Sequence, residues 1–224
     1  MDLGFIFDLD GTIIDTLDYY RQVWQELLDE HDLEHDVSPF LTRPTRENFR
    51  ILLGDELPEH EMEHHVARQA AMGQAKMQTQ GVRVNQGIRE LIQGLRAQNV
   101  KLAVATAAEP ANAEWALQNA GLRDFFETVV TDRDVENGKP APDIYLEAMY
   151  RLGVDTSRCA VLEDSPLGIR GAKRAGIKVI GIVTTHARIE IEQAGADLIV
   201  HSANELDAAN VIRFILSTHE NKKS

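Results

Sequence analysis

The pattern of apolar and polar positions changes at about residue 82. From Val82 onward, short apolar runs of strand length alternate with stretches whose apolar residues recur every three or four positions. This alternation predicts strands and helices in turn, as in a parallel sheet covered by helices on both faces. The predicted elements are strands over 100–105, 128–131, 159–162, 178–183 and 197–200, and helices over 110–119, 142–152, 166–175 and 204–216.

The first strand comes before this alternation and ends in two carboxylates. Leu3 and the run 5–7 predict a buried strand, which Asp8 and Asp10 follow directly. Side chains alternate along a strand, so the two carboxylates point to the same side. Buried charge is costly unless a cation or a donor compensates it. Aspartate is also common in turns, so this stretch alone leaves both an ordinary turn and a reactive site open.

Residues 15–81 have a helical pattern and no expected strand. The expected features, in order, are a helix over 17–28, breaks at Ser38–Pro39 and Arg43–Pro44, a short helix beginning at Thr45, and a helix over 59–78. The sequence therefore predicts a doubly wound, Rossmann-like α/β core of residues 1–14 and 82–224, with a small all-α unit inserted over 15–81.

Composition limits the function classes. A length of 224 residues that are 43% hydrophobic allows one full core and a smaller unit. The net charge of −13 argues against nucleic acid and anionic membranes as partners. No apolar run approaches the ~20 residues of a membrane span, and the first strand follows Met1 closely, so we expect a cytoplasmic protein. Cys159 is expected in the core, and the oligomeric state stays open, a monomer included.

Polar side chains gather where the predicted strands end. The residues concerned are Asp8, Asp10, Thr106, Lys139, Glu163 and Asp164. In an open parallel sheet, ligands bind beyond the carboxyl ends of the strands. Taken alone, Thr106 reads as a helix cap, Lys139 as a solvated loop lysine, and Asp164 as an ordinary helix start. Their common position at one sheet edge favours a functional site.

Four segments of the chain resemble the signature motifs of the haloacid dehalogenase superfamily. They are Asp8-Leu9-Asp10-Gly11-Thr12 with Asp15-Thr16, then Thr106, then Lys139-Pro140-Ala141-Pro142-Asp143, and finally Leu162-Glu163-Asp164-Ser165 with Gly168-Ile169. They occur in family order and span nearly the whole chain. The branch they resemble contains phosphatases and phosphomutases with a helical cap after the first strand, and the last segment is especially similar to β-phosphoglucomutase and its phosphatase relatives.

The resemblance implies a role for each of these residues. Asp8 would be the nucleophile that forms an aspartyl-phosphate, and Asp10 the acid/base that protonates the departing alkoxide and then activates water. Thr106 and Lys139 would bind phosphoryl oxygens. The implied cofactor is Mg²⁺, held by Asp8, Asp10 through its backbone carbonyl, Asp164 and, as a further candidate, Glu163.

The resemblance also implies that residues 15–81 form a cap that closes over the site and selects the substrate. The substrate-binding candidates are Tyr20, Arg46, Lys76 and Ala107. Tyr20 stands where the mutase relatives carry a histidine, and Ala108-Glu109 where they carry polar or basic residues. Glu109 would repel a second phosphate.

The sequence therefore predicts a Mg²⁺-dependent phosphatase that hydrolyses a small phosphorylated metabolite, such as a sugar phosphate, through an aspartyl-phosphate. Two alternatives remain: a β-phosphoglucomutase-type phosphosugar mutase, and a catalytically silent binding module on the same scaffold. Dehalogenase chemistry is not expected, because it does without the metal and the second aspartate.

One metal-site pattern is rejected. His60 and His64, with Glu61 between them, fit the zinc-protease pattern of two histidines one turn apart. Such a site needs a third ligand, and residues 66–89 contain no Asp, Glu, His or Cys. We expect the solvated face of an amphipathic helix instead.

Overall fold

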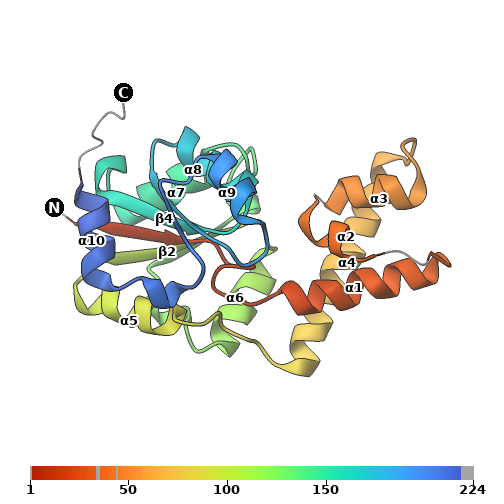
Figure 1. The fold of residues 1–224 in the computed structure, drawn as a ribbon, viewed down its shortest axis with the longest axis horizontal. Coiled ribbons are helices and arrows are strands. Elements are labelled where there is room, and N and C mark those ends of the chain that lie inside the picture. The colour runs from red at the N-terminus through yellow and green to blue at the C-terminus, as the bar shows by residue number, and fades with distance from the viewer. Residues whose placement is uncertain (1, 34–35, 44, 218–224) are drawn as a thin grey trace. The chain divides into compact units, whose positions relative to one another are not determined.

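The structure is a computed structural model that describes residues 2–33, 36–43 and 45–217. The chain divides into two compact units (Figure 1). The core unit comprises Met1–Ile14 and Val84–Ser224, and the helical unit comprises Asp15–Arg83. The change in hydrophobic pattern at about residue 82 thus lies close to the point where the chain returns to the core.

The core unit contains a six-stranded parallel sheet with the order β3-β2-β1-β4-β5-β6. Its strands are β1 (Gly4–Phe7), β2 (Lys101–Thr106), β3 (Thr128–Thr131), β4 (Cys159–Glu163), β5 (Lys178–Ile182) and β6 (Leu198–Val200). Phe7, the last residue of β1, lies opposite Val104 of β2 and Leu162 of β4. The carboxyl ends of these three central strands therefore meet at one edge, which confirms the predicted α/β class.

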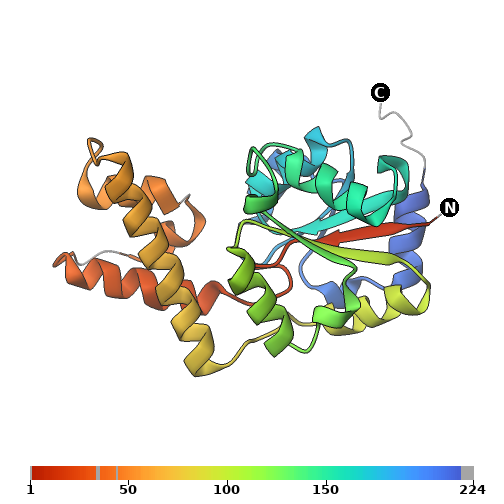
Figure 2. The same ribbon diagram turned by 180° about the vertical axis from the view of Figure 1, so that it is seen from behind.

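Helices cover both faces of this sheet (Figures 1 and 2). The helices of the core unit are α5 (Ile88–Ala97), α6 (Pro110–Asn119), α7 (Asp143–Leu152), α8 (Pro166–Arg174), α9 (Arg188–Ala194) and α10 (Ala208–Leu216). Helices α7, α8 and α9 bury Tyr145, Ile169 and Ile191 against one face. Helices α5, α6 and α10 lie on the other face, and for α5 and α6 this is the side that right-handed crossovers require.

The predicted element boundaries needed correction in a few places. The prediction did not separate α5 and α9 from their surroundings. The last helix was expected over 204–216, but a 3₁₀ turn occupies Ala203–Glu205 and α10 begins at Ala208. The reason is local: the Asp207 carboxylate accepts a hydrogen bond from the backbone N–H of Asn210 and caps the helix there.

The helical unit is built on its own apolar cluster. Its helices are α1 (Leu17–Glu30), α2 (Ser38–Thr42), α3 (Thr45–Leu53) and α4 (Glu59–Gln80). The Trp24 ring of α1 packs against Phe40 of α2 and Phe49 of α3. The break expected at Ser38–Pro39 is displaced: α1 already ends at Glu30, and Ser38–Pro39 open α2, because proline is tolerated in the first turn of a helix. For the break at Arg43–Pro44, Pro44 lies outside the described residues.

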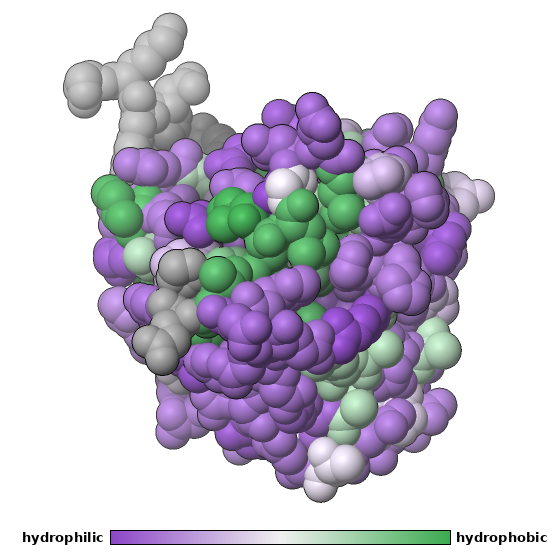
Figure 3. Space-filling model, turned by 90° about the vertical axis from the view of Figure 1, so that its right-hand side faces the viewer, coloured by the Kyte–Doolittle hydropathy of each residue, from purple (hydrophilic) through white to green (hydrophobic). Residues whose placement is uncertain are grey.

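The face drawn in Figure 3 is mainly hydrophilic. In Figure 3, hydrophilic side chains surround a patch of exposed apolar ones. Apolar exposure of this kind is ordinary for a folded protein, and Ile51 in the helical unit is 54% exposed. Among the described residues, none of the helices has the length and apolar character needed to cross a membrane.

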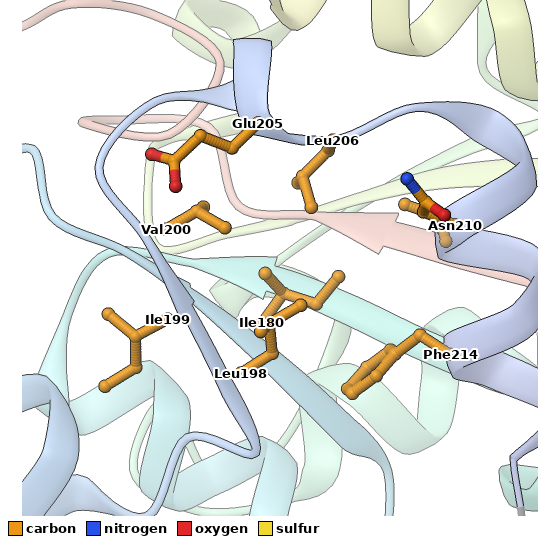
Figure 4. A pocket seen from close by; sticks show the side chains of 9 residues that line it. Ile180, Leu198, Ile199, Val200, Glu205, Leu206, Asn210 and Phe214 are labelled. Atoms are coloured by element: carbon orange, nitrogen blue, oxygen red, sulfur yellow. The ribbon is translucent and has the colours of Figure 1, made fainter.

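A cavity of about 280 Å³ lies between the edge of the sheet and α10 (Figure 4). It is lined by Ile180, Leu198, Ile199, Val200, Glu205, Leu206, Asn210, Val211 and Phe214. None of the predicted site residues lines it. The chemistry therefore has to be sought at the carboxyl edge of the central strands.

Candidate active site

Lys139 is the centre of a buried ionic cluster. Its ammonium group donates to Asp8 Oδ1 at 2.5 Å, to Glu163 Oε1 at 2.7 Å and to the Ala105 carbonyl at 3.2 Å. The lysine side chain is only 8% exposed, so it is not the solvated loop lysine that it would be in isolation. The loop before α7 thus brings one positive charge to the ends of β1, β2 and β4.

Three carboxylates surround this region. Asp8, Glu163 and Asp164 each offer an oxygen within 4.8 Å of the others, and all three are buried. Oδ1 of Asp164 accepts from the Thr12 hydroxyl at 2.9 Å, and Oδ2 accepts from the Thr185 hydroxyl. Each carboxylate oxygen has two lone pairs, so both oxygens of Asp164 keep one for a cation.

The carboxylate of Glu163 accepts more hydrogen bonds than that of Asp164. Its Oε1 accepts from Lys139 Nζ and from the Tyr145 hydroxyl, and its Oε2 accepts from the N–H and the hydroxyl of Ser165. These four hydrogen bonds use the four lone-pair positions of a carboxylate. Gly168 makes room for it, because a Cβ at that residue would lie 1.6 Å from Glu163 Oε1. The geometry therefore favours a role for Glu163 in holding Lys139 in place and disfavours a role as a metal ligand.

The turn after β1 is held against Asp164. Gly11 has a φ of +82°, and a Cβ there would lie 2.3 Å from Asp164 Oδ2, so only glycine fits. Asn85 Nδ2 donates to the carbonyls of Gly11 and Thr12 at 2.8 and 3.0 Å, and the Thr184 hydroxyl donates to the Gly11 carbonyl at 2.7 Å. These bonds fix the backbone of the turn that follows Asp8 and Asp10 and that lies against Asp164.

The pKa values of the three innermost groups follow from burial and their shared charges. Burial raises the pKa of Asp8 well above its usual value, and the nearby charges of Glu163 and Asp164 add to this against the opposing charge of Lys139. Burial alone would lower the pKa of Lys139, but Asp8 and Glu163 outweigh it and hold that pKa well above its usual value. Burial opposes ionisation of Glu163, yet the Lys139 charge keeps the pKa of Glu163 low. The lysine–glutamate pair is therefore ionised.

The remaining two aspartates titrate near neutrality. Burial raises the pKa of Asp10 to about 6. Burial, with the charge of Glu163, raises the pKa of Asp164 to about 7. A carboxyl group with a pKa near 6 can deliver a proton and take one back close to neutral pH, which is what an acid/base catalyst needs.

Thr106 ends β2 beside this cluster. It is buried, and its Oγ1 accepts a hydrogen bond from the Ala108 N–H at 3.0 Å. Since a hydroxyl also carries one donor, this arrangement leaves the O–H of Thr106 for an oxygen at the sheet edge. Ala107 is exposed directly after it. The structure thus brings Asp8, Lys139, Glu163 and Asp164 into one cluster, with Thr106 at the adjoining strand end.

The three predicted cap residues belong to the helical unit. Arg46 Nη1 is bonded to Glu59 Oε1 at 2.6 Å, and Lys76 Nζ is paired with Glu26. The Tyr20 ring lies against α4, where a Cβ on Gly73 would be 2.9 Å from Tyr20 Cε1. These partners lie within the same unit, and a role of the three residues in substrate binding stays a prediction.

Sequence reasoning missed two side chains of the site. Tyr145 lies on α7 and bonds to Glu163, and nothing in the sequence distinguishes it from a core tyrosine. Thr185 follows β5 and bonds to Asp164. Here a signal existed: the rule that selected Thr106, a polar residue directly after an apolar strand, applies equally to the stretch 184–186.

The family model for haloacid dehalogenase-like hydrolases matches residues 5–182. The chain belongs to this family.

Proteins named as a phosphatase and a phosphoglucomutase align with most of the chain. Fructose-1-phosphate phosphatase YqaB of Escherichia coli is 32% identical over 188 residues, which cover 80% of this chain and 95% of that protein. Beta-phosphoglucomutase of Bacillus subtilis is 30% identical over 212 residues, which cover 90% of each chain. A crystal structure of a family IA, variant 3 hydrolase from Entamoeba histolytica has a TM-score of 0.85 and 25% identity, covering 97% of this chain and 100% of that one.

Proposed function

We propose that this haloacid dehalogenase-like hydrolase is a phosphatase that releases inorganic phosphate from a small phosphorylated metabolite, in the first place a sugar phosphate. One observation carries the proposal: a single buried lysine is bonded to Asp8 and Glu163, with Asp164 in the same cluster. A nucleophilic carboxylate beside a fixed positive charge suits phosphoryl transfer. The name of the fructose-1-phosphate phosphatase relative supports a sugar phosphate as substrate.

The first half of the reaction uses the two aspartates of the turn. Asp8 reacts as its carboxylate, the form that the charge of Lys139 favours against burial. One of its oxygens attacks phosphorus, forming an O–P bond as the bond to the ester oxygen breaks. The Thr106 hydroxyl binds an equatorial oxygen, while Lys139, whose three hydrogens lie on Asp8, Glu163 and the Ala105 carbonyl, offsets the phosphoryl charge through its own fixed charge. Asp10, with a pKa of about 6, gives its proton to the departing alkoxide.

The second half restores the enzyme. Asp10, now ionised, takes a proton from water, whose oxygen attacks phosphorus and displaces the Asp8 carboxylate. Inorganic phosphate leaves, and Asp10 is again protonated. The complete reaction consumes one phosphate monoester and one water molecule, and it needs no other reactant.

The donor set suits Mg²⁺, which prefers one or two carboxylates together with water and phosphate oxygens. Asp8 and Asp164 would hold the ion, with the Asp10 carbonyl as a third oxygen. Both oxygens of Asp164 keep a lone pair, whereas those of Glu163 have none to spare. When bound, the ion supplies further neutralisation of phosphoryl charge.

A phosphosugar mutase is the second candidate, since beta-phosphoglucomutase also matches the chain. Its reaction passes through a bisphosphate, which needs positive charge for the second phosphate. Here Glu109, directly before α6, binds Arg133 through two hydrogen bonds of 3.0 and 3.2 Å. The arginine is thereby engaged by a carboxylate, which favours hydrolysis of a monophosphate.

The test is phosphate release from a chromogenic aryl phosphate and from a panel of sugar phosphates. We expect activity with Mg²⁺, its loss in chelator, and a loss of at least ~10³-fold in Asp8→Asn, because the nucleophile is removed. Asp124→Asn, at an exposed aspartate of the core unit, is the matched control and should retain activity. Activity that survives the chelator or Asp8→Asn would contradict the mechanism. Interconversion of sugar phosphates faster than phosphate release would favour the mutase.

A further inference from the structure

The loop after β5 reaches across to the acidic cluster. Thr185 donates a hydrogen bond from Oγ1 to Asp164 Oδ2, and the same oxygen lies 2.9 Å from Nδ1 of His186. Its methyl carbon packs over the turn after β1, 2.7 Å from where a Cβ on Gly11 would stand. Thr184, its neighbour, bonds to the Gly11 carbonyl. This loop is thus tied both to the turn and to Asp164.

The hydroxyl of Thr185 has one hydrogen, which decides the direction of these bonds. When Asp164 is ionised, its carboxylate can only accept, so the hydrogen of Thr185 points to Oδ2. The contact with His186 then requires Nδ1 of the imidazole to carry the hydrogen and to donate it to Thr185. A chain of two hydrogen bonds therefore runs from His186 through Thr185 to Asp164.

The carboxylate of Asp164 is held at both ends. Thr12 bonds to Oδ1 from within the turn after β1, and Thr185 bonds to Oδ2 from the loop after β5. One hydrogen bond would let the carboxylate rotate about its Cβ–Cγ bond, whereas two bonds from different segments fix its plane. A fixed plane directs the remaining lone pairs to one position, which lowers the cost of binding a cation there.

We propose that Thr185 is a positioning residue that orients Asp164 and thereby sets the affinity of the site for a divalent cation. This inference rests on the proposed function, because it needs Asp164 to be a metal ligand. Partners that orient metal ligands change metal affinity by roughly 10- to 100-fold when they are removed. Thr185 should therefore act on cation binding, with little direct effect on the phosphoryl steps.

The experiment compares Thr185→Val with Thr185→Ser. Valine keeps the methyl group and the shape of threonine but removes the hydroxyl, whereas serine keeps the hydroxyl. Mg²⁺ binding to the purified, chelator-stripped protein is measured by calorimetry. We expect the dissociation constant to rise ~10-fold or more in Thr185→Val and to stay within about threefold of the wild type in Thr185→Ser. Far-ultraviolet circular dichroism checks that both variants are folded.

Kinetics give a second readout that a merely structural role would not move. In Thr185→Val, the Mg²⁺ concentration for half-maximal activity should rise with the dissociation constant, while kcat at saturating Mg²⁺ stays within about threefold. A Thr185→Val protein that binds Mg²⁺ as the wild type does would overturn this inference alone. A wild-type protein that binds no Mg²⁺ would overturn both this inference and the metal-dependent function.

Discussion

At the scale of single residues, the buried cluster around Lys139 requires a glycine at position 168. The Oε1 atom of Glu163 occupies the space in which any residue but glycine at position 168 would place its Cβ, at 1.6 Å. Gly168 lies in the first turn of α8, where intrinsic helix propensity would favour alanine by about 1 kcal/mol. Packing against Glu163 and helix propensity therefore predict opposite effects of the same substitution.

We expect the steric clash with Glu163 to outweigh the gain in helix propensity, so Gly168→Ala should be destabilising. The added methyl group would push Glu163 off Lys139 and Tyr145, and breaking a buried ion pair costs about 3 kcal/mol. Because Lys139 would also lose its anchor, kcat/KM should fall ~10²-fold or more. Denaturant unfolding and steady-state kinetics measure the two effects.

Gly94→Ala is the matched control. Gly94 is also helical, but its added Cβ would meet the Ala208 Cβ at an ordinary 3.4 Å. We expect this variant to be as stable as the wild type or more stable by up to about 1 kcal/mol, with unchanged activity. If Gly168→Ala behaved like Gly94→Ala, the close approach of Glu163 to α8 would be refuted.

At the residue level, the sequence predicts position where topology alone decides it. Thr106 ends a parallel strand, and Asp8 and Asp164 directly follow two others, so their common place at one sheet edge needs only the order of elements. The prediction that Glu163 binds metal depended on side-chain partners that no pattern displays. The four hydrogen bonds from Lys139, Tyr145 and Ser165 become visible only in three dimensions.

At the scale of elements, two lysines show how helix ends are satisfied. Lys178 of β5 is buried, and its ammonium group donates to the carbonyls of Phe214, Ile215 and Ser217 at the end of α10. Lys101 of β2 donates to the carbonyl of Leu152, the last residue of α7, but its side chain is 34% exposed. The carbonyls at a helix C-terminus carry partial negative charge, and a cation there is favourable.

We expect Lys178→Met to destabilise the protein by about 2 kcal/mol, because methionine fills the space but leaves the carbonyl of buried Ile215 without its donor. Lys101→Met should cost less than about 1 kcal/mol, since water can replace the ammonium group at this more exposed end. Urea unfolding of both variants measures the difference. Equal losses of unfolding free energy in the two variants would mean that burial does not determine how much Lys178 stabilises the end of α10.

A helix or strand could be predicted from the sequence when residues within that element determine its structure. The strands were found because each is a compact apolar run. Helix α9 was not found, because Ile189 and Ile191 alternate with glutamates as in a strand, and only Ile191 is buried. A seven-residue segment of this kind is helical through its contacts, including Ile191 against Gly181, and not through propensity.

At the scale of the whole molecule, the proposed function predicts that stability and Mg²⁺ binding are linked through the acidic cluster. In the metal-free protein, Asp164 has a pKa of about 7 against its usual 3.8, because of burial and the charge of Glu163. A carboxyl group whose pKa is higher in the folded chain than in the unfolded chain holds its proton more tightly when folded. Its contribution to the free energy of unfolding is present in full below about pH 4 and is lost as the pH rises through about 7.

We therefore expect the metal-free wild type to lose stability relative to Asp164→Asn between pH 5 and pH 8, by on the order of 2 kcal/mol. The asparagine carries no charge, so its folded state does not pay for ionisation in that range. Denaturant unfolding in chelator at the two pH values measures the difference. Titrating groups away from the cluster act on both proteins alike and cancel, whereas Asp8, whose pKa the charge of Asp164 raises, adds to the difference in the same direction.

Adding Mg²⁺ at pH 8 should then stabilise the wild type by about 2.7 kcal/mol at a concentration 100-fold above the dissociation constant. Asp164→Asn should gain much less, because the amide cannot supply the negative charge that the ion needs. A cation that binds the folded state also favours the ionised carboxylate, so Mg²⁺ should remove most of the pH dependence of the wild type. If the wild type and Asp164→Asn lost stability in parallel from pH 5 to pH 8 in chelator, the raised pKa of Asp164 would be contradicted, and the linkage of Mg²⁺ to this carboxylate would have to be abandoned with it.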